Sequence, residues 1–254
     1  MRSLLFVPAH KDYLTKKALE SKADAIIFDL EDSCPGERNK EHGLYNISRY
    51  GGLCSSSTIT RISNKEQIGH VHTDYIMYPK AECIDFSLKG FKIILLIETA
   101  LGIMNIKNLM SLSVVEGAAF GNEDYLANTG CCDYSFAQNF IVNCAKAYGK
   151  FAIDSVNADV HNLGKLKQDC KNGAGLGFDG KLCIHPKEIE IIHRYYTPTE
   201  EEYNHARRII ELYDQAEADG SGVAIIDGVY VAPPMVKYAQ KIIKKYETYC
   251  SSEH

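Results

Sequence analysis

Two acidic residues and one arginine follow short apolar runs of this chain. Glu98 directly follows the run KIILLI, Asp124 comes shortly after GAAF, and Arg61 ends the run TIT. If these runs are parallel strands of one sheet, their carboxyl ends lie at one edge and the three side chains can converge. Two carboxylates, completed by water and substrate oxygens, suit Mg²⁺, and the planar guanidinium of arginine suits a substrate carboxylate.

This combination indicates an enzyme that binds an anionic keto or hydroxy acid at Mg²⁺ and stabilises an enolate oxygen. A salt-bridge network that closes the same edge is an alternative that the spacing leaves open. Because an unpaired buried carboxylate is costly, Glu98 also needs a positive neighbour. Arg61, Lys80 or a metal ion could provide that charge.

A denser acidic cluster follows another apolar run. We expect Asp29 to point into the interior or to cap a strand. Glu31 and Asp32 could hold metal-bound water or orient Arg61, or they could simply begin a polar loop. His185 could act as a general base, but a histidine at this position more often hydrogen-bonds a loop backbone, and we favour that structural role.

The remaining motifs give weaker signals. The glycine-rich segment at residues 173–177 resembles a phosphate-binding run, but it precedes a strand and is predicted to be a flexible loop. Nine cysteines without a CxxC spacing are typical of free thiols in a reducing cytoplasm.

The elements that would position these residues follow a regular alternation. Short apolar runs alternate with more polar stretches that can form helices, as in parallel sheets whose strands are buried on both faces. Eight such units predict a (β/α)8 TIM barrel, somewhat trimmed because only short or broken helices fit between the second, third and fourth runs. The eight runs are residues 3–7, 25–30, 58–62, 75–78, 92–97, 117–120, 151–153 and 181–184.

The barrel is predicted to occupy residues 1–198, and residues 199–254 form a helix, hairpin and lid-like extension of the same domain. Thr199 and Glu202 have capping-box spacing at the start of a helix over 199–218. A hairpin is expected at 223–231 around Asp227, followed by a helix over 235–249. This extension could cover the mouth of its own barrel or that of a neighbouring subunit.

Composition excludes several classes of protein. The net charge is -5, and lysine and arginine are scattered, which argues against a nucleic-acid or anionic membrane surface. The most apolar run, residues 93–104, is interrupted by Glu98 and is shorter than the roughly 20 residues of a membrane span. The amino terminus lacks a secretory signal, so we expect a soluble, cytoplasmic protein.

Six segments resemble the HpcH/HpaI aldolase and citrate lyase beta subunit superfamily, closest to its citrate lyase beta-like branch. The resemblance spans nearly the whole chain and implies a TIM barrel, usually trimeric or hexameric. It also implies Mg²⁺-dependent cleavage or formation of a carbon–carbon bond in 3-hydroxy acyl thioesters. The segments are RSLLFVPA, ADAIIFDLEDS, IMYPKAE, LLIETALGIMN, AFGNEDY and GFDGKLCIHPKEI.

The resemblance also implies roles for individual residues. The family's two metal carboxylates fall on Glu98 and Asp124, and its substrate-carboxylate arginine falls on Arg61. The acidic pair that supports metal-bound waters and this arginine falls on Glu31 and Asp32.

The substrate half of the site is implied in the same way. Backbone amides of the turn at Gly121 and Asn122 would lie close to the bound keto acid. The predicted reaction is cleavage of a citryl-, malyl- or citramalyl-type acid or thioester to a 2-keto acid and an acetyl-type fragment. The carrier, coenzyme A, an acyl carrier protein or none, stays open. The alternatives are a malate synthase-like condensation or a repurposed keto-acid-binding subunit.

Several residues depart from the family pattern. The most consequential is Ala232, which stands where the family has a lid aspartate that serves as acid/base in a neighbouring subunit's site. Its loss puts ordinary thioester enolisation in doubt, and Asp227 cannot be assumed to replace it. The other departures are Ala9 for glycine, Asn39 for lysine, Gly43 for arginine and Ser63 for asparagine.

Overall fold

A computed structural model describes residues 1–84, 90–220, 224–226 and 228–250 of the 254-residue chain. The chain divides into two compact units, Met1–Tyr196 and Thr197–His254. Each unit is described separately.

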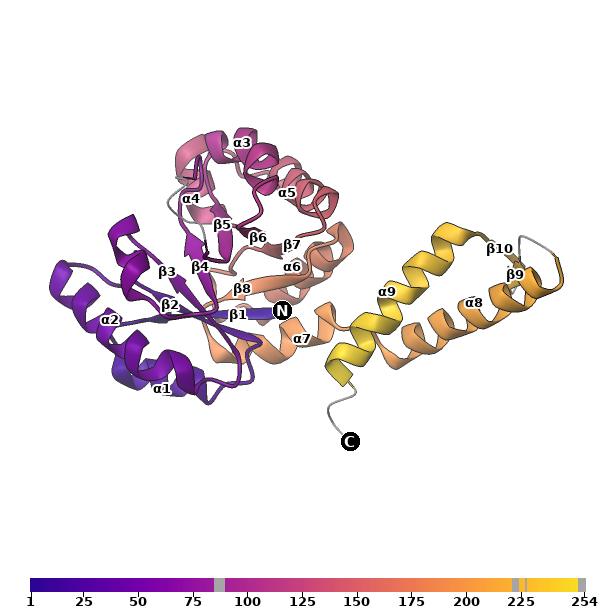
Figure 1. The fold of residues 1–254 in the computed structure, drawn as a ribbon, viewed down its shortest axis with the longest axis horizontal. Helices are drawn as coiled ribbons and strands as arrows, with labels where there is room; N and C mark the ends of the chain where they lie inside the picture. Colours follow the sequence, from indigo (N-terminus) through magenta and orange to yellow (C-terminus); the bar gives the residue numbers. More distant parts are fainter. Residues whose placement is uncertain (85–89, 221–223, 227, 251–254) are drawn as a thin grey trace. The chain divides into compact units, whose positions relative to one another are not determined.

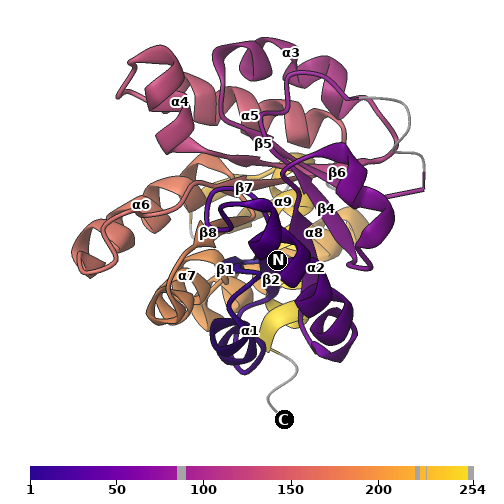
Figure 2. The same cartoon turned by 90° about the vertical axis from the view of Figure 1, so that its left-hand side faces the viewer.

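The first unit is a closed barrel of eight parallel strands in chain order, with β8 pairing back onto β1 (Figure 1). The predicted (β/α)8 fold is confirmed, and every predicted strand lies within two residues of its observed bounds. In Figure 2 the helices surround the ring of strands. The strands are β1 Ser3–Pro8, β2 Ala25–Asp29, β3 Ser57–Arg61, β4 Tyr75–Tyr78, β5 Ile93–Ile97, β6 Val115–Phe120, β7 Phe151–Asp154 and β8 Gly180–Cys183.

Strand β5 shows why the apolar runs are continuous. Ile94 and Leu96 belong to the cluster inside the barrel, whereas Ile93, Leu95 and Ile97 belong to the cluster between strands and helices. Both faces of the strand are therefore buried, and neither can carry the polar residues of a half-exposed strand. The surrounding helices are α1 Asp12–Leu19, α2 Glu37–Tyr50, α3 Ala100–Met110, α4 Asn122–Thr129, α5 Ser135–Ala147, α6 Leu163–Leu176 and α7 Ile189–Tyr196.

The predicted trimming of the barrel is correct for one connection and wrong for another. Between β3 and β4 the described helical structure is a short 3₁₀ helix, Lys65–His70. Between β2 and β3, however, α2 is a full helix of 14 residues. Its buried face includes Gly43 and Asn46, so the apolar periodicity that identifies a helix from sequence is weak there.

The glycine-rich segment at 173–177 was predicted to be a flexible loop, and this prediction is wrong. Residues 173–176 form the last turn of α6, and Gly177 ends the helix in the left-handed conformation with φ of 98°. This is the common glycine cap of a helix and not a flexible loop. Gly173 itself lies so close to the Tyr196 hydroxyl and the Asp154 carboxylate that a Cβ atom would collide with both.

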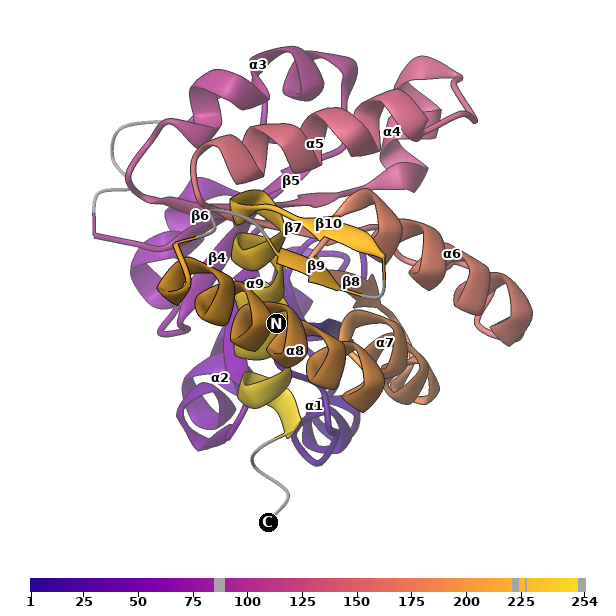
Figure 3. The same cartoon turned by 90° about the vertical axis from the view of Figure 1, so that its right-hand side faces the viewer.

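The second unit consists of two helices and a two-stranded antiparallel sheet (Figure 3). Thr199 and Glu202 form the predicted capping box at the start of α8, Glu200–Ala218. The predicted hairpin is present as β9 Ala224–Ile226 and β10 Val229–Val231, although residues 223 and 227 lie outside the described residues. Helix α9, Pro233–Cys250, packs on α8 through a small apolar core.

Within the described parts of the chain, no helix has the length and hydropathy needed to span a membrane.

Candidate active site

A pocket of about 340 Å³ lies at the carboxyl ends of the barrel strands. This is where parallel barrels place their reactive groups, because the loops that follow the strands are free to vary. Of the predicted site residues, all but Glu31 line it. The lining residues are Phe6, Pro8, Asp29, Asp32, Ser33, Arg61, Leu96, Glu98, Phe120, Gly121, Asn122, Glu123, Asp124, Val156, Leu182 and Ile184.

Glu98 follows β5 directly and its side chain is buried, with 2% of the residue exposed. One carboxylate oxygen, Oε1, accepts a 2.7 Å hydrogen bond from the backbone N–H of Lys80. Burial raises the pKa of Glu98 to about 7 despite this bond, and the nearby Asp124 adds to the shift. A Cβ atom on Gly121 would lie 2.7 Å from Glu98 Oε2, so the close approach of β6 to this carboxylate requires glycine.

Asp124 is presented by the first turn of α4. Its carboxylate is partly exposed, and its Oδ1 lies 4.0 Å from Lys80 Nζ. Asn122, in the same turn, has a buried Oδ1 atom without a hydrogen-bond partner. Asp124 thus lies at the amino end of a helix, a position that attracts negatively charged groups.

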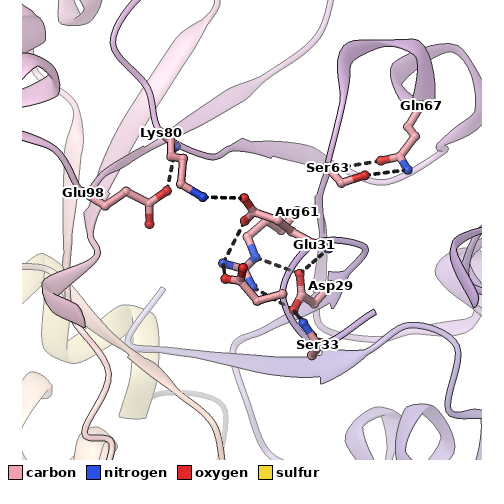
Figure 4. A network of polar contacts seen from close by, with 9 residues as sticks. Asp29, Glu31, Ser33, Arg61, Ser63, Gln67, Lys80 and Glu98 are labelled. Atoms are coloured by element: carbon pink, nitrogen blue, oxygen red, sulfur yellow. Dashed lines mark hydrogen bonds and ion pairs between the residues drawn. The ribbon is translucent and has the colours of Figure 1, made fainter. Parts of the chain in front are cut away.

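Arg61 is bound by carboxylates on several sides (Figure 4). Its Nε and Nη2 each donate a 2.7 Å bond to Asp29, and its Nη1 lies 3.1 Å from Glu31 and 3.0 Å from Asp32. Burial opposes charge on Asp29, but the arginine and a bond from Ser33 hold the pKa of this carboxyl below its usual value. Arg61 is therefore a fixed cation. Its Nε and Nη2 groups, here called its two-point face, are already occupied by Asp29.

Lys80 connects the two halves of the network. Its Nζ lies 3.2 Å from Glu31 Oε1, and Figure 4 draws this contact as a dashed line. Among the described residues, Lys80 is the one non-glycine residue with a left-handed backbone, at φ of 44°. Such a conformation is uncommon for a residue with a side chain. Here it directs the Lys80 amide to Glu98 while the ammonium reaches Glu31. Burial raises the pKa of Glu31, partly offset by the charge of Arg61.

The donor set fits a hard divalent cation. Glu98 has no Lys, Arg or His side chain within 4.0 Å among the residues that the structure describes. Burial raises the pKa of Glu98, and the buried Asn122 Oδ1 has no hydrogen-bond partner, so both residues offer oxygen acceptors to a cation. Described side chains supply no cluster of three His, Cys, Asp or Glu metal ligands. A cation would therefore take the carboxylates of Glu98 and Asp124, with water and substrate oxygens completing its shell.

Two other strand-end residues do not join this site. The His185 side chain accepts a bond from the Lys187 N–H and forms a capping box with Glu188, the structural role that we favoured. Asp154 points away from the pocket lining and pairs with the buried Lys181 at 2.9 Å.

Some residues of the site were not identified from sequence. Asp29 was not recognised as the main partner of Arg61, although the two residues end neighbouring strands and lie opposite each other in the β2–β3 register. The available sequence signal was their equivalent position near the ends of the second and third predicted runs. Glu123 and the apolar residues Phe6 and Phe120 line the pocket without having been singled out.

Two of the family departures are explained by a single contact. A Cβ atom on Gly43 would lie 2.5 Å from Leu30 Cδ2 and 3.1 Å from the Ala9 Cβ. The methyl group of Ala9 and the missing side chain at position 43 therefore complement each other, and an arginine there would not fit. Ser63 is engaged with Gln67 in two hydrogen bonds, separate from the pocket (Figure 4).

Curated relatives align over nearly the whole chain. Citrate lyase subunit beta of Escherichia coli K12 is 29% identical over 97% of this chain and 93% of that protein. A (3S)-malyl-CoA thioesterase of Cereibacter sphaeroides is 28% identical over 97% of this chain and 94% of that protein.

Solved structures show the same fold. The protein CitE of Mycobacterium tuberculosis, in complex with magnesium, acetoacetate and coenzyme A, matches with a TM-score of 0.80 and 25% identity, covering 96% of this chain and 97% of that one. A citrate lyase beta subunit of the same organism, complexed with oxaloacetate and magnesium, matches with a TM-score of 0.70 and 27% identity, covering 77% and 96%.

The family profile described as HpcH/HpaI aldolase/citrate lyase matches residues 58–186, just over half of the chain. This stretch contains Arg61, Glu98 and Asp124. The chain therefore belongs to the HpcH/HpaI aldolase/citrate lyase family.

Proposed function

We propose that this protein is a Mg²⁺-dependent carbon–carbon lyase that cleaves a carboxylated 3-hydroxy acid or its acyl thioester to a 2-keto acid and an acetyl-type fragment. The observation that carries the proposal is the buried Glu98 carboxylate, which has no cationic partner within 4.0 Å among the described residues and lies in the pocket with Asp124. Solved relatives that contain magnesium with oxaloacetate or acetoacetate support it.

Glu98 and Asp124 would hold the cation. Mg²⁺ bound there would act as a Lewis acid and stabilise the negative charge that develops on the keto-acid and enolate oxygens. The close packing of Gly121 on Glu98 would keep that carboxylate in one orientation. Backbone amides at Gly121 and Asn122 would lie beside the keto acid.

Arg61 would bind a substrate carboxylate, but not through its two-point face, which Asp29 occupies. Its outer Nη1 group faces Asp32, whose side chain is 60% exposed. A substrate carboxylate could replace that exposed partner while Asp29 keeps the guanidinium in position. Asp29 is thus assigned a positioning role that the sequence did not suggest.

Cleavage also needs a group that accepts the proton of the substrate hydroxyl. Glu31 and Asp32 are the candidates, because both adjoin Arg61 and the lid aspartate of the family is Ala232 here. Burial raises the pKa of Glu31, so this carboxylate is more basic than an ordinary glutamate.

Several further features belong to the proposal. The family suggests a homotrimeric assembly and leaves the carrier open between coenzyme A, an acyl carrier protein and none. The sequence pattern suggests a barrel over residues 1–198 with residues 199–254 as an extension of the same domain. All nine cysteines are free, which supports a reducing, cytoplasmic compartment.

The test is binding of 2-keto acids with and without Mg²⁺, followed by a thioester cleavage assay. Stabilisation against heat should require metal and acid together and should disappear in Glu98→Gln and Asp124→Asn. Glu123→Gln is the matched control, because this exposed glutamate lines the same pocket but is not assigned to the metal. Absence of any metal-dependent shift with any acid would overturn the proposal.

A repurposed binding protein is the second candidate, favoured by Ala232 at the acid/base position. It would bind metal and keto acid in the same assay, and it would fail to cleave any thioester. Turnover of a thioester in the second assay would exclude it.

A further inference from the structure

The pocket has an apolar side that the proposed chemistry does not use. The lining residues contributed by β7, β8 and β1, with the loops that follow them, are all apolar: Phe6, Pro8, Val156, Leu182 and Ile184. These three strands are neighbours in the closed barrel. Their side chains therefore form a continuous surface, here called the apolar arc. The charged lining residues all come from the β2–β6 side.

The charges of the pocket are strongly one-sided. Its lining contains five carboxylates and a single cation, Arg61. Lys80 is bound to Glu31 on the β4 side and is not a lining residue. Lys181 lies on β8 beside the apolar arc, but it points outward into a buried ion pair with Asp154. Arg61 packs over the Phe6 ring at one end of the apolar arc, with its guanidinium carbon 5.0 Å from the ring centroid. The strands β7, β8 and β1 themselves contribute no cation to the described pocket lining.

This arrangement disfavours a second carboxylate on the keto-acid half of the substrate. The first carboxylate and the keto oxygen would be satisfied by the metal and Arg61. The five lining carboxylates outnumber the charges of Arg61 and a bound Mg²⁺. A second carboxylate would therefore either approach this excess of negative charge or lose its hydration against the apolar arc without a partner, and both are costly. An alkyl group at the same position would instead bury apolar surface favourably.

We propose that the apolar arc selects a monocarboxylic 2-keto acid with an alkyl substituent, so that the substrate is of the citramalyl type and not of the citryl type. This inference rests on the proposed function and names the substrate class of the same site.

The test is a comparison of acids by calorimetry at a fixed free Mg²⁺ concentration. Pyruvate and 4-methyl-2-oxopentanoate are compared with freshly prepared oxaloacetate. The branched acid has nearly the shape of oxaloacetate, with two methyl groups in place of the carboxylate oxygens. At least one alkyl acid should bind ten times more tightly than oxaloacetate. Equal or tighter binding of oxaloacetate would overturn this inference alone, whereas no binding of any acid would overturn the proposed function with it.

A variant that adds a positive charge to the apolar arc tests whether this surface is responsible. Ile184→Arg places a cation at the rim of the pocket, where the isoleucine is 42% exposed and substitution should not disturb folding. In this variant, the ratio of the affinity for alkyl acids to the affinity for oxaloacetate should fall at least fivefold. Leu53→Arg is the control, because Leu53 is 74% exposed and precedes β3 at the opposite end of the barrel. An unchanged preference in folded Ile184→Arg and in a second variant, Val156→Lys, would overturn the role of the apolar arc.

Discussion

Glu98 is a carboxylate in an environment that does not favour its charge. It is buried at the end of β5, accepts a hydrogen bond from the Lys80 amide, and has Asp124 nearby. Burial without a compensating cation shifts the equilibrium toward the neutral acid. The residue thus lowers the stability of the metal-free protein at neutral pH, which is a common property of sites arranged for a ligand.

A pH-dependent loss of stability follows from this shift. The pKa of Glu98 is raised from 4.5 to about 7. Between these two values the unfolded chain loses the proton while the folded protein keeps it. The favourable contribution is therefore complete below 4.5 and is lost as pH rises through 7. The loss is on the order of 3 kcal/mol, since each pKa unit corresponds to about 1.4 kcal/mol.

Urea denaturation of the metal-free protein between pH 4 and pH 8 measures this effect. The free energy of unfolding of Glu98→Gln relative to wild type should increase over this range, because glutamine does not titrate. Glu123→Gln should show no such trend, since Glu123 is exposed. Parallel pH profiles for wild type and Glu98→Gln would refute the raised pKa.

At the scale of elements, α2 shows how packing without apolar side chains can define a helix position. Gly43 is buried against Leu30 and Ala9, and the Asn46 side chain donates a 2.9 Å bond to the Ala9 carbonyl. The helix is therefore held against the loop after β1 by a close backbone approach and one buried hydrogen bond. These contacts also place the acidic loop after β2, which carries Glu31 and Asp32.

Gly43→Ala should therefore destabilise the protein. The new methyl group would lie 2.5 Å from Leu30 Cδ2, and such overpacking costs about 1–3 kcal/mol. Gly175→Ala is the matched control, since Gly175 is also helical and has nothing within 4 Å of an added Cβ. It should stabilise by about 0.5–1 kcal/mol through helix propensity. Urea midpoints measure both, and equal effects in the two variants would contradict the packing argument.

At the scale of the whole molecule, barrel closure creates the site. Asp29, Arg61, Glu98 and the turn at Gly121 come from four different strands or the residues directly after them. They become neighbours because parallel strands in chain order present their carboxyl ends at one rim. In the second unit, described by itself, Ala232 directly precedes α9, and its carbonyl accepts the Met235 N–H at 2.9 Å.

Ala232→Asp should have two separable effects. An aspartate directly before α9, followed by Pro233, can cap the helix and should stabilise it by about 0.5–2 kcal/mol. If the family's acid/base role can be restored, the same variant should cleave a thioester at least ten times faster than wild type. Ala232→Asn is the control, because it caps the helix but cannot transfer a proton. Equal thioester cleavage by the two variants would contradict the acid/base interpretation.

Most of the fold could be predicted from local pattern. The eight strands are continuous apolar runs because both of their faces are buried, and the charged residues that end them mark the rim. The carboxylates Glu98 and Asp124 and the cation Arg61 were found in this way, and the structure places all three in one pocket. Helix α2 was expected to be short or broken because of the interval between the second and third runs, whereas the chain forms 14 helical residues there.

Only the tertiary structure decided how these residues are paired and which surface faces the substrate. Asp29 occupies the two-point face of Arg61, and Lys80 adopts a left-handed conformation that joins Glu98 to Glu31. These contacts depend on strand register and on distances between residues far apart in the chain, which no local pattern encodes. The apolar arc has the same origin, because β7, β8 and β1 become neighbours only when the barrel closes.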